Sequence, residues 1–193
     1  GGALYYFPQI WTSDDTDGLE RTKIQWGTSV CYPVSAMSCH VSACPNHQTG
    51  RTTPFATRGA IASLGATGYE LDLTKLSEEE KEQVREQIEN YKQIDELVLK
   101  GDLYRLADPF KGNYFCEMLV SKDKSKAYVV GERFRGDPCD HDRVLKLCGL
   151  DEEKTYTVKE LNVTASGAAL MGAGLFCPRL PDCGSWVWHI GEV

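Results

Sequence analysis

The sequence predicts an α/β segment followed by an all-β domain: βα units of a (β/α)8 barrel, then an antiparallel β-sandwich. Over about the first half, short apolar segments with strand character alternate with amphipathic helical segments, which is typical of parallel βα units. Later, short β-branched and aromatic runs follow one another with turn-rich segments between them, a spacing typical of antiparallel domains. We therefore expect a barrel portion over residues 1–101 and a β domain over residues 102–193.

Strands and helices should alternate in the barrel portion. The expected strands cover residues 4–10, 35–43 and 68–73, and the expected helices cover residues 19–30, 54–64 and 77–99. The helix at 19–30 follows a polar run that ends at Asp17, because short oxygen-bearing side chains cap free N–H groups. Leu19, Trp26 and Val30 can share one apolar face of that helix.

The helix at 77–99 has the clearest signals. Ser77 and Glu80 have the spacing of a capping box, and Gly101 is placed to end the helix. An apolar stripe should run along it, formed by Val84, Ile88, Tyr91 and Val98. In the β domain, the expected strands cover residues 103–106, 114–120, 127–130, 144–148, 155–158 and 186–190.

Two or three βα units cannot close a barrel, because they would leave an unpaired sheet edge and a half-covered core. The chain has no starting Met, and Gly1-Gly2 runs straight into the apolar residues 3–10. We therefore expect a larger barrel whose earlier strands lie outside these residues.

Composition excludes some functions. A net charge of −7 gives no basic face for nucleic acid. No run of eighteen apolar residues is present, so we expect no membrane span. The chain has eight cysteines and no secretion signal, so we expect reduced thiols in a cytoplasmic protein. They are Cys31, Cys39, Cys44, Cys116, Cys139, Cys148, Cys177 and Cys183.

A group of carboxylates marks the candidate site. Asp14, Asp15 and Asp17 lie just after the expected strand at 4–10, where barrel enzymes place working residues. A carboxyl there could protonate a leaving oxygen, and Trp11 offers an apolar face to a sugar or to the acid. The alternative is a capped helix start with solvated acids.

Residues 4–17, LYYFPQIWTSDDTD, resemble the acid-bearing motif of the α-galactosidases of glycoside hydrolase family 36. The match continues through residues 19–21, 23–25, 40–43 and 45–54, and residues 68–74 resemble the last barrel strand of that family. The resemblance is strong over about residues 1–110 and weak over the β domain. It implies that residues 1–101 are the end of the barrel.

The resemblance also implies a retaining mechanism with two carboxylates on opposite sides of the glycosidic bond. Asp14 takes the position of the acid/base, Asp15 and His40 support it without touching the sugar, and Asp17 is a supporting helix cap. The nucleophile belongs to an upstream Lys-x-Asp motif, which is not found before Asp14. The implied substrates are raffinose- and melibiose-type α-galactosides, with no cofactor or metal. The parent protein is expected to be a homo-oligomer, with a tetramer possible.

Several alternatives stay open. The same fold could act on α-N-acetylgalactosaminides. A non-catalytic module could bind carbohydrate through Trp186 and Trp188, which point the same way along a strand, although core packing also explains them.

Four potential zinc ligands lie close together, and either His among them could line the cleft: Cys39, His40, Cys44 and His47. Their spacing is not that of a standard zinc motif. Residues 139–141 could suggest a Cys–His nucleophile pair, but neighbours in a turn cannot readily form a supported triad.

Overall fold

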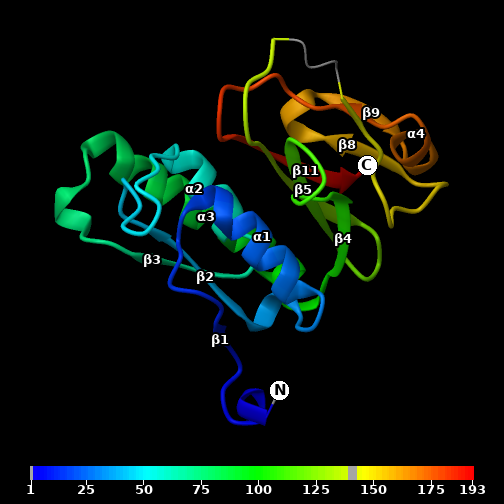
Figure 1. The fold of residues 1–193 in the computed structure, drawn as a ribbon. Helices are drawn as coiled ribbons and strands as arrows, with labels where there is room; N and C mark the ends of the chain where they lie inside the picture. Colours follow the sequence, from blue (N-terminus) through cyan, green and yellow to red (C-terminus); the bar gives the residue numbers. More distant parts are fainter. Residues whose placement is uncertain (1, 139–142) are drawn as a thin grey trace. The chain divides into compact units, whose positions relative to one another are not determined.

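The computed structural model describes residues 2–138 and 143–193 (Figure 1). The chain divides into two compact units, Gly1–Leu99 and Lys100–Val193. Within the described ranges, no helix combines the length and the apolar character that crossing a membrane requires. Each unit has its own sheet, and the candidate site lies in the first.

A three-stranded parallel sheet organises the first unit, with its strands in chain order. The strands are β1 (Ile10–Trp11), β2 (Met37–Ser42) and β3 (Ala66–Glu70). Helices connect and follow them: α1 (Gly18–Ser29), α2 (Phe55–Ala62) and α3 (Glu78–Lys100), with short 3-10 turns η2 (Val34–Ala36) and η3 (Leu73–Lys75). Parallel neighbours need such crossovers, so the alternating pattern is confirmed. The closed barrel stays a prediction.

The strand expected at residues 4–10 is wrong for most of its length. A 3-10 helix, η1 (Gly2–Tyr5), takes its first part, and only Ile10 and Trp11 pair with β2. The reason is register. β2 begins at Met37, which lies opposite Ile10, so no β2 residue faces the chain before that point. An apolar run without a neighbouring backbone to bond cannot form a ladder.

Helix α1 buries a polar face, which corrects the apolar face expected for it. Arg21, Thr22 and Gln25 are buried, whereas Val30 is exposed. The Gln25 side-chain amide donates to the Ile61 carbonyl at 2.9 Å. Buried polar groups are tolerated when they are hydrogen-bonded, so tertiary partners outweigh hydropathy here.

Helix α3 confirms its predicted start and end. The Ser77 N–H donates to Glu80 Oε2 at 2.9 Å, and the Glu80 N–H donates to Ser77 Oγ at 3.1 Å, which is a capping box. The helix ends at Lys100, just before Gly101. Ile88 is exposed, so it does not belong to the buried stripe; that stripe instead contains the buried residues Ile94, Leu97 and Val98.

The second unit is built on a six-stranded antiparallel sheet with the order β4-β5-β6-β11-β8-β9. Its strands are β4 (Asp102–Ala107), β5 (Tyr114–Val120), β6 (Lys126–Arg133), β8 (Thr155–Val158), β9 (Val163–Ser166) and β11 (Gly184–Glu192). A second, two-stranded sheet pairs β7 (Val144–Leu145) with β10 (Leu175–Phe176). Helix α4 (Gly167–Gly172) and the 3-10 turn η4 (Lys159–Leu161) complete the unit.

The second layer of this β domain is smaller than the sandwich expected from the sequence. Leu145 of β7, Leu175 of β10 and Leu170 of α4 join the core that covers one face of the large sheet. The strand expected at residues 144–148 is only two residues long, and β9, α4 and β10 were not predicted. Within the part of the chain that the structure describes, a pair of short strands and the short helix α4 therefore stand in place of a full second sheet.

Trp186 and Trp188 belong to the core of the second unit. Trp188 is 1% exposed and Trp186 is 7% exposed, and both pack in the main apolar cluster. Their rings lie 6.0 Å apart and are tilted by 48°. Rings this deeply buried cannot present a flat surface to a sugar, so core packing is confirmed and the carbohydrate-binding strip is excluded.

Candidate active site

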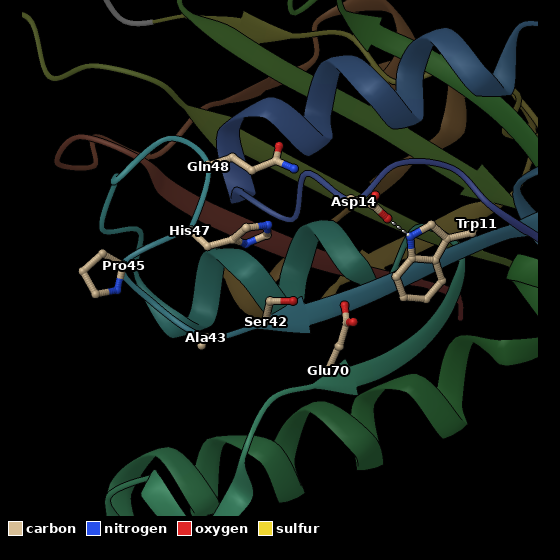
Figure 2. Close-up of a pocket in the computed structure, with 8 residues that line it drawn as sticks. All are labelled: Trp11, Asp14, Ser42, Ala43, Pro45, His47, Gln48 and Glu70. Atoms are coloured by element: carbon tan, nitrogen blue, oxygen red, sulfur yellow. Dashed lines mark hydrogen bonds between the residues drawn. The ribbon is translucent and has the colours of Figure 1, made fainter.

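A pocket lies at the carboxyl end of the parallel sheet. Trp11, Ser42 and Glu70 are the last residues of β1, β2 and β3, and Asp14 follows three residues after Trp11. The pocket has a volume of about 410 Å³ and opens to solvent (Figure 2). Its lining residues are Trp11, Asp14, Ser42, Ala43, Pro45, His47, Gln48 and Glu70. This is the edge of a parallel sheet where α/β proteins place their ligands.

Asp14 is an exposed carboxylate that one neighbour orients. The Trp11 indole N–H donates to Asp14 Oδ1 at 2.7 Å, as the dashed line in Figure 2 shows. This bond joins the last residue of β1 to a carboxylate three positions further along the chain. Because Oδ1 accepts this bond, the two oxygens of Asp14 are no longer equivalent toward a proton or a ligand.

Trp11 rests on His40, which comes from the middle of β2. The two rings are stacked, with centroids 4.1 Å apart and an interplanar angle of 23°. His40 is only 7% exposed, so it forms a fixed surface beneath the indole. The indole itself is 52% exposed, which leaves ring surface available in the pocket.

His40 also lies beside Glu70 of the neighbouring strand. His40 Nε2 is 3.2 Å from Glu70 Oε2, close enough for an ion pair but without the direction of a hydrogen bond. Burial and the nearby charge of Arg21 lower the pKa of His40, and they outweigh the opposite effect of Glu70. The imidazole is therefore held toward its neutral form at neutral pH.

Asp15 and Asp17 stand behind the pocket and do not line it. Asp15 Oδ1 accepts the Asp17 N–H at 3.0 Å. Asp17 is 1% exposed and is the N-cap of α1, accepting from the Leu19 and Glu20 N–H groups. Neither carboxylate is in a position to touch a ligand in this pocket.

Asp17 also holds the loop that carries two pocket residues. Its Oδ2 accepts the Thr49 hydroxyl at 2.9 Å, and its Oδ1 forms an ion pair with Arg51. The loop thus fastened, from Pro45 to Arg51, places His47 and Gln48 in the pocket wall (Figure 2). A buried, multiply bonded carboxylate of this kind fixes loop geometry.

The four potential zinc ligands do not meet. Cys39 is buried, with its Sγ 3.9 Å from the Leu64 carbonyl, and Cys44 Sγ lies 3.8 Å from the Arg51 carbonyl. Among the described residues, no three His, Cys, Asp or Glu side chains are grouped so that they could hold a metal ion. The seven cysteines in those ranges are free thiols, whereas Cys139, Asp140 and His141 lie outside the described residues.

Sequence analysis singled out Trp11 and Asp14, and it named His47 as a possible residue of the cleft wall. All three line the pocket. Sequence analysis missed Ser42, Gln48 and Glu70. Glu70 had an available signal, because it lies in an expected strand of a parallel unit and such strands direct their last residues toward the site. The signal was lost because the strand was expected at 68–73, which places Glu70 inside it, whereas β3 ends there.

Comparison with known proteins covers both units. The Melibiase family model matches residues 1–101, and the model of the glycosyl hydrolase family 36 C-terminal domain matches residues 114–190. Alpha-galactosidase AgaA of Geobacillus stearothermophilus is 47% identical over 193 residues, which is 100% of this chain and 26% of that protein. Alpha-galactosidase Mel36A of Lactobacillus acidophilus is 46% identical, covering 92% of this chain and 24% of that protein.

Solved structures agree with these relatives. A GH36 α-galactosidase AgaA variant from Geobacillus stearothermophilus in complex with raffinose matches with a TM-score of 0.97 and 45% identity, covering 100% of this chain and 27% of that one. The galactosidase domain of the α-galactosidase–sucrose kinase AgaSK also matches with a TM-score of 0.97, at 44% identity and the same coverage. The chain thus spans about a quarter of the length of the relatives it matches. It belongs to glycoside hydrolase family 36, the melibiase family.

Proposed function

We propose that this chain supplies the acid/base part of the active site of a retaining α-galactosidase, with Asp14 as the acid/base. The observation that carries the proposal is the position of Asp14 in an open pocket at the carboxyl end of a parallel sheet. There its carboxylate accepts a hydrogen bond from the Trp11 indole N–H. The match of residues 1–101 to the melibiase model supports the reaction class. The three parallel strands would be the last part of the (β/α)8 barrel.

The reaction has two steps. First, a carboxylate nucleophile attacks the anomeric carbon of a terminal galactose. The bond from that carbon to the leaving oxygen breaks, and Asp14 gives its proton to that oxygen. Second, Asp14 takes a proton from water, the water oxygen attacks the same carbon, and the glycosyl–enzyme ester bond breaks to restore the nucleophile. The two carboxylates of such enzymes lie about 5–5.5 Å apart.

The nucleophile is proposed to come from outside these 193 residues. The resemblance to the family places it on a Lys-x-Asp strand motif, and residues 1–13 contain no Lys or Asp. Glu70 is the other carboxylate that lines the pocket, so it is the one in the described site that could compete for this role. Its position beside the buried His40 favours a supporting function instead.

The proposed substrates are α-galactosides of the raffinose and melibiose type. A relative has been crystallised with raffinose, and another variant of the same relative with stachyose. The exposed part of the Trp11 ring would contact the sugar, and the loop that carries His47 and Gln48 would lie along the pocket wall. A homo-oligomeric parent protein and a cytoplasmic location complete the proposal.

Hydrolysis of raffinose and of an aryl α-galactoside by the full-length protein that carries this segment tests the proposal. Asp14→Asn should lower kcat/KM for raffinose about 10²–10⁴-fold, the usual contribution of general acid catalysis. The 193-residue chain by itself should show no turnover. Full activity of Asp14→Asn would remove Asp14 from the mechanism. Turnover by the isolated chain would instead show that both carboxylates lie within it, and Glu70→Gln would then identify the second.

A further inference from the structure

Three side chains form a series of contacts that runs from the candidate acid Asp14 across the three parallel strands. Trp11 Nε1 is 2.7 Å from Asp14 Oδ1, the Trp11 ring is stacked on His40 at 4.1 Å, and His40 Nε2 is 3.2 Å from Glu70 Oε2. The three come from three neighbouring parallel strands, β1, β2 and β3. Local sequence does not bring them together, because His40 and Glu70 lie far from Trp11 along the chain.

We propose that Trp11, His40 and Glu70 form a positioning chain that holds the Asp14 carboxyl in one orientation, with Oδ2 directed to the leaving oxygen. The proposal rests on the proposed function, since it assigns residues that act through Asp14. In it Trp11 is a positioning residue through its N–H group. The contact of its ring with the sugar is a separate role, and the two can be measured separately.

Asp14 needs an external restraint because it is exposed on a segment without regular structure. A carboxyl on such a segment can rotate, and its two oxygens are equivalent until something distinguishes them. The bond from Trp11 removes that equivalence, because Oδ1 accepts the indole N–H. The proposal therefore assigns the acidic proton to Oδ2. Proton transfer depends on this geometry, because misplacing a reacting group by about 1 Å can cost 10²-fold in rate.

Trp11 in turn needs its own support. It ends a strand of only two residues and is half exposed, so few contacts from β1 restrain its ring. His40 supplies a rigid wall, because it is 7% exposed and lies in the middle of β2. The stack restricts rotation of the indole about its side-chain bonds and keeps the N–H directed at Asp14.

Glu70 completes the arrangement at the pocket side. Its side chain is 58% exposed, and Figure 2 shows it projecting from the end of β3 toward Trp11 and Ser42. The charged groups around His40 are Glu70 on β3 and Arg21 on α1, which act in opposite directions on the imidazole. Removing the Glu70 charge would leave the Arg21 charge unopposed at His40, and it would change the surroundings of the ring that supports the indole.

The experiment compares two leaving groups in the full-length protein. Raffinose releases a poor leaving group that needs a proton, whereas a dinitrophenyl α-galactoside releases a stable phenolate that needs none. kcat/KM reports the step in which the leaving group departs. Loss of proton donation must therefore lower kcat/KM for raffinose much more than for the dinitrophenyl substrate. A purely structural defect or a lost sugar contact would lower both equally.

The informative variants keep shape and remove one function each. Trp11→Phe keeps an aromatic ring over His40 but removes the N–H, and Glu70→Gln keeps the volume but removes the charge. We expect the ratio of kcat/KM values, raffinose to dinitrophenyl substrate, to fall about tenfold in Trp11→Phe, as for loss of one hydrogen bond to a charged group. It should fall a few-fold in Glu70→Gln. Glu79→Gln, an exposed carboxylate in the first turn of α3, is the matched control and should leave the ratio unchanged.

The outcomes separate this proposal from the function on which it rests. If Asp14→Asn lowers the ratio but Trp11→Phe and Glu70→Gln lower both substrates equally, the positioning chain is wrong and the acid assignment stands. If Asp14→Asn itself leaves the ratio unchanged, the proposed function of Asp14 is wrong. Thermal unfolding of each variant checks folding, and Glu70→Gln keeps the test decisive if Trp11→Phe does not fold.

Discussion

Two buried carboxylates, Asp17 in the first unit and Glu117 in the second, are partnered to different extents. In the first unit, Asp17 accepts bonds from two helix N–H groups, the Thr49 hydroxyl and Arg51. In the second, Glu117 on β5 is fully buried, and within the described residues its oxygens accept no hydrogen bond. Arg105 is a neighbouring cation, with its Nε 3.8 Å from Glu117 Oε1. One carboxylate is surrounded by hydrogen-bond donors and a cation, whereas the other lies in a site that disfavours its charge.

The two units accommodate a buried carboxylate in different ways. Burial raises the pKa of Glu117 to about 8, only partly opposed by Arg105. Asp17 fastens the loop beside the pocket, so its partners serve the geometry of the site. The second unit instead relies on its apolar core, where a neutral Glu117 is tolerated as a polar side chain of suitable shape.

Truncation of the apolar core should have the largest effect. Trp188→Ala removes a large ring that is 1% exposed, and we expect it to lower the free energy of unfolding by about 4 kcal/mol. Urea denaturation measures this. Val144→Ala, an exposed position of β7, is the control and should change stability by less than about 0.5 kcal/mol. A small loss in Trp188→Ala would mean that the core of the second unit does not decide its stability.

Loss of the buried partner network in the first unit should rank next. Asp17→Ala removes the cap of α1 and leaves Arg51 and Thr49 without their shared acceptor, so we expect a loss of about 3 kcal/mol. Asp17→Asn keeps an acceptor for the helix N–H groups and should lose less. The same variants should weaken substrate binding through His47 and Gln48. If Asp17→Ala and Asp15→Ala were equally mild, Asp17 would not be the anchor of the loop.

The smallest expected effect concerns Glu117 and depends on pH. Its folded-state pKa lies above the unfolded value, so the folded state holds a proton that the unfolded state releases. The stability associated with Glu117 is therefore complete below about pH 4.5 and is lost as pH rises toward about 8. We expect a loss on the order of 2 kcal/mol between pH 5 and 8, because relaxation and water entry reduce the full linkage of about 1.4 kcal/mol per unit.

Glu117→Gln should abolish this contribution. The measurement is the difference in the free energy of unfolding between the native protein and the variant across that pH range, in which other titrating groups cancel. A difference that stays constant with pH would show that Glu117 titrates normally. Glu79→Gln again serves as the exposed control and should give no slope.

Much of the fold could be predicted where the signal is local. The strands β5 and β8 have the predicted bounds, because each is a compact apolar or β-branched run set off by turns. The start of α3 was predicted because a capping box involves only residues within one turn. β9, α4 and β10 were missed, since their segments are short and their apolar residues gain a clear face only in the core.

The candidate site was predicted in part for the same reason. Trp11 and Asp14 are three residues apart, so a sequence motif could associate them. The link from Trp11 to His40 and Glu70 depends on the pairing of β1 with β2 and of β2 with β3. Register of this kind is set by backbone partners distant in sequence, which no local pattern specifies.

The sequence alone determined the alternation of strands and helices, the helix caps and the carboxylate motif, because these depend on neighbours within a few residues. Tertiary structure decided where β1 begins, which face of α1 is buried and which side chains surround Asp14. In each case the deciding group is a backbone or side chain brought from a distant part of the chain. Ile10 pairs only because Met37 lies opposite, and Gln25 is buried because the Ile61 carbonyl accepts its amide.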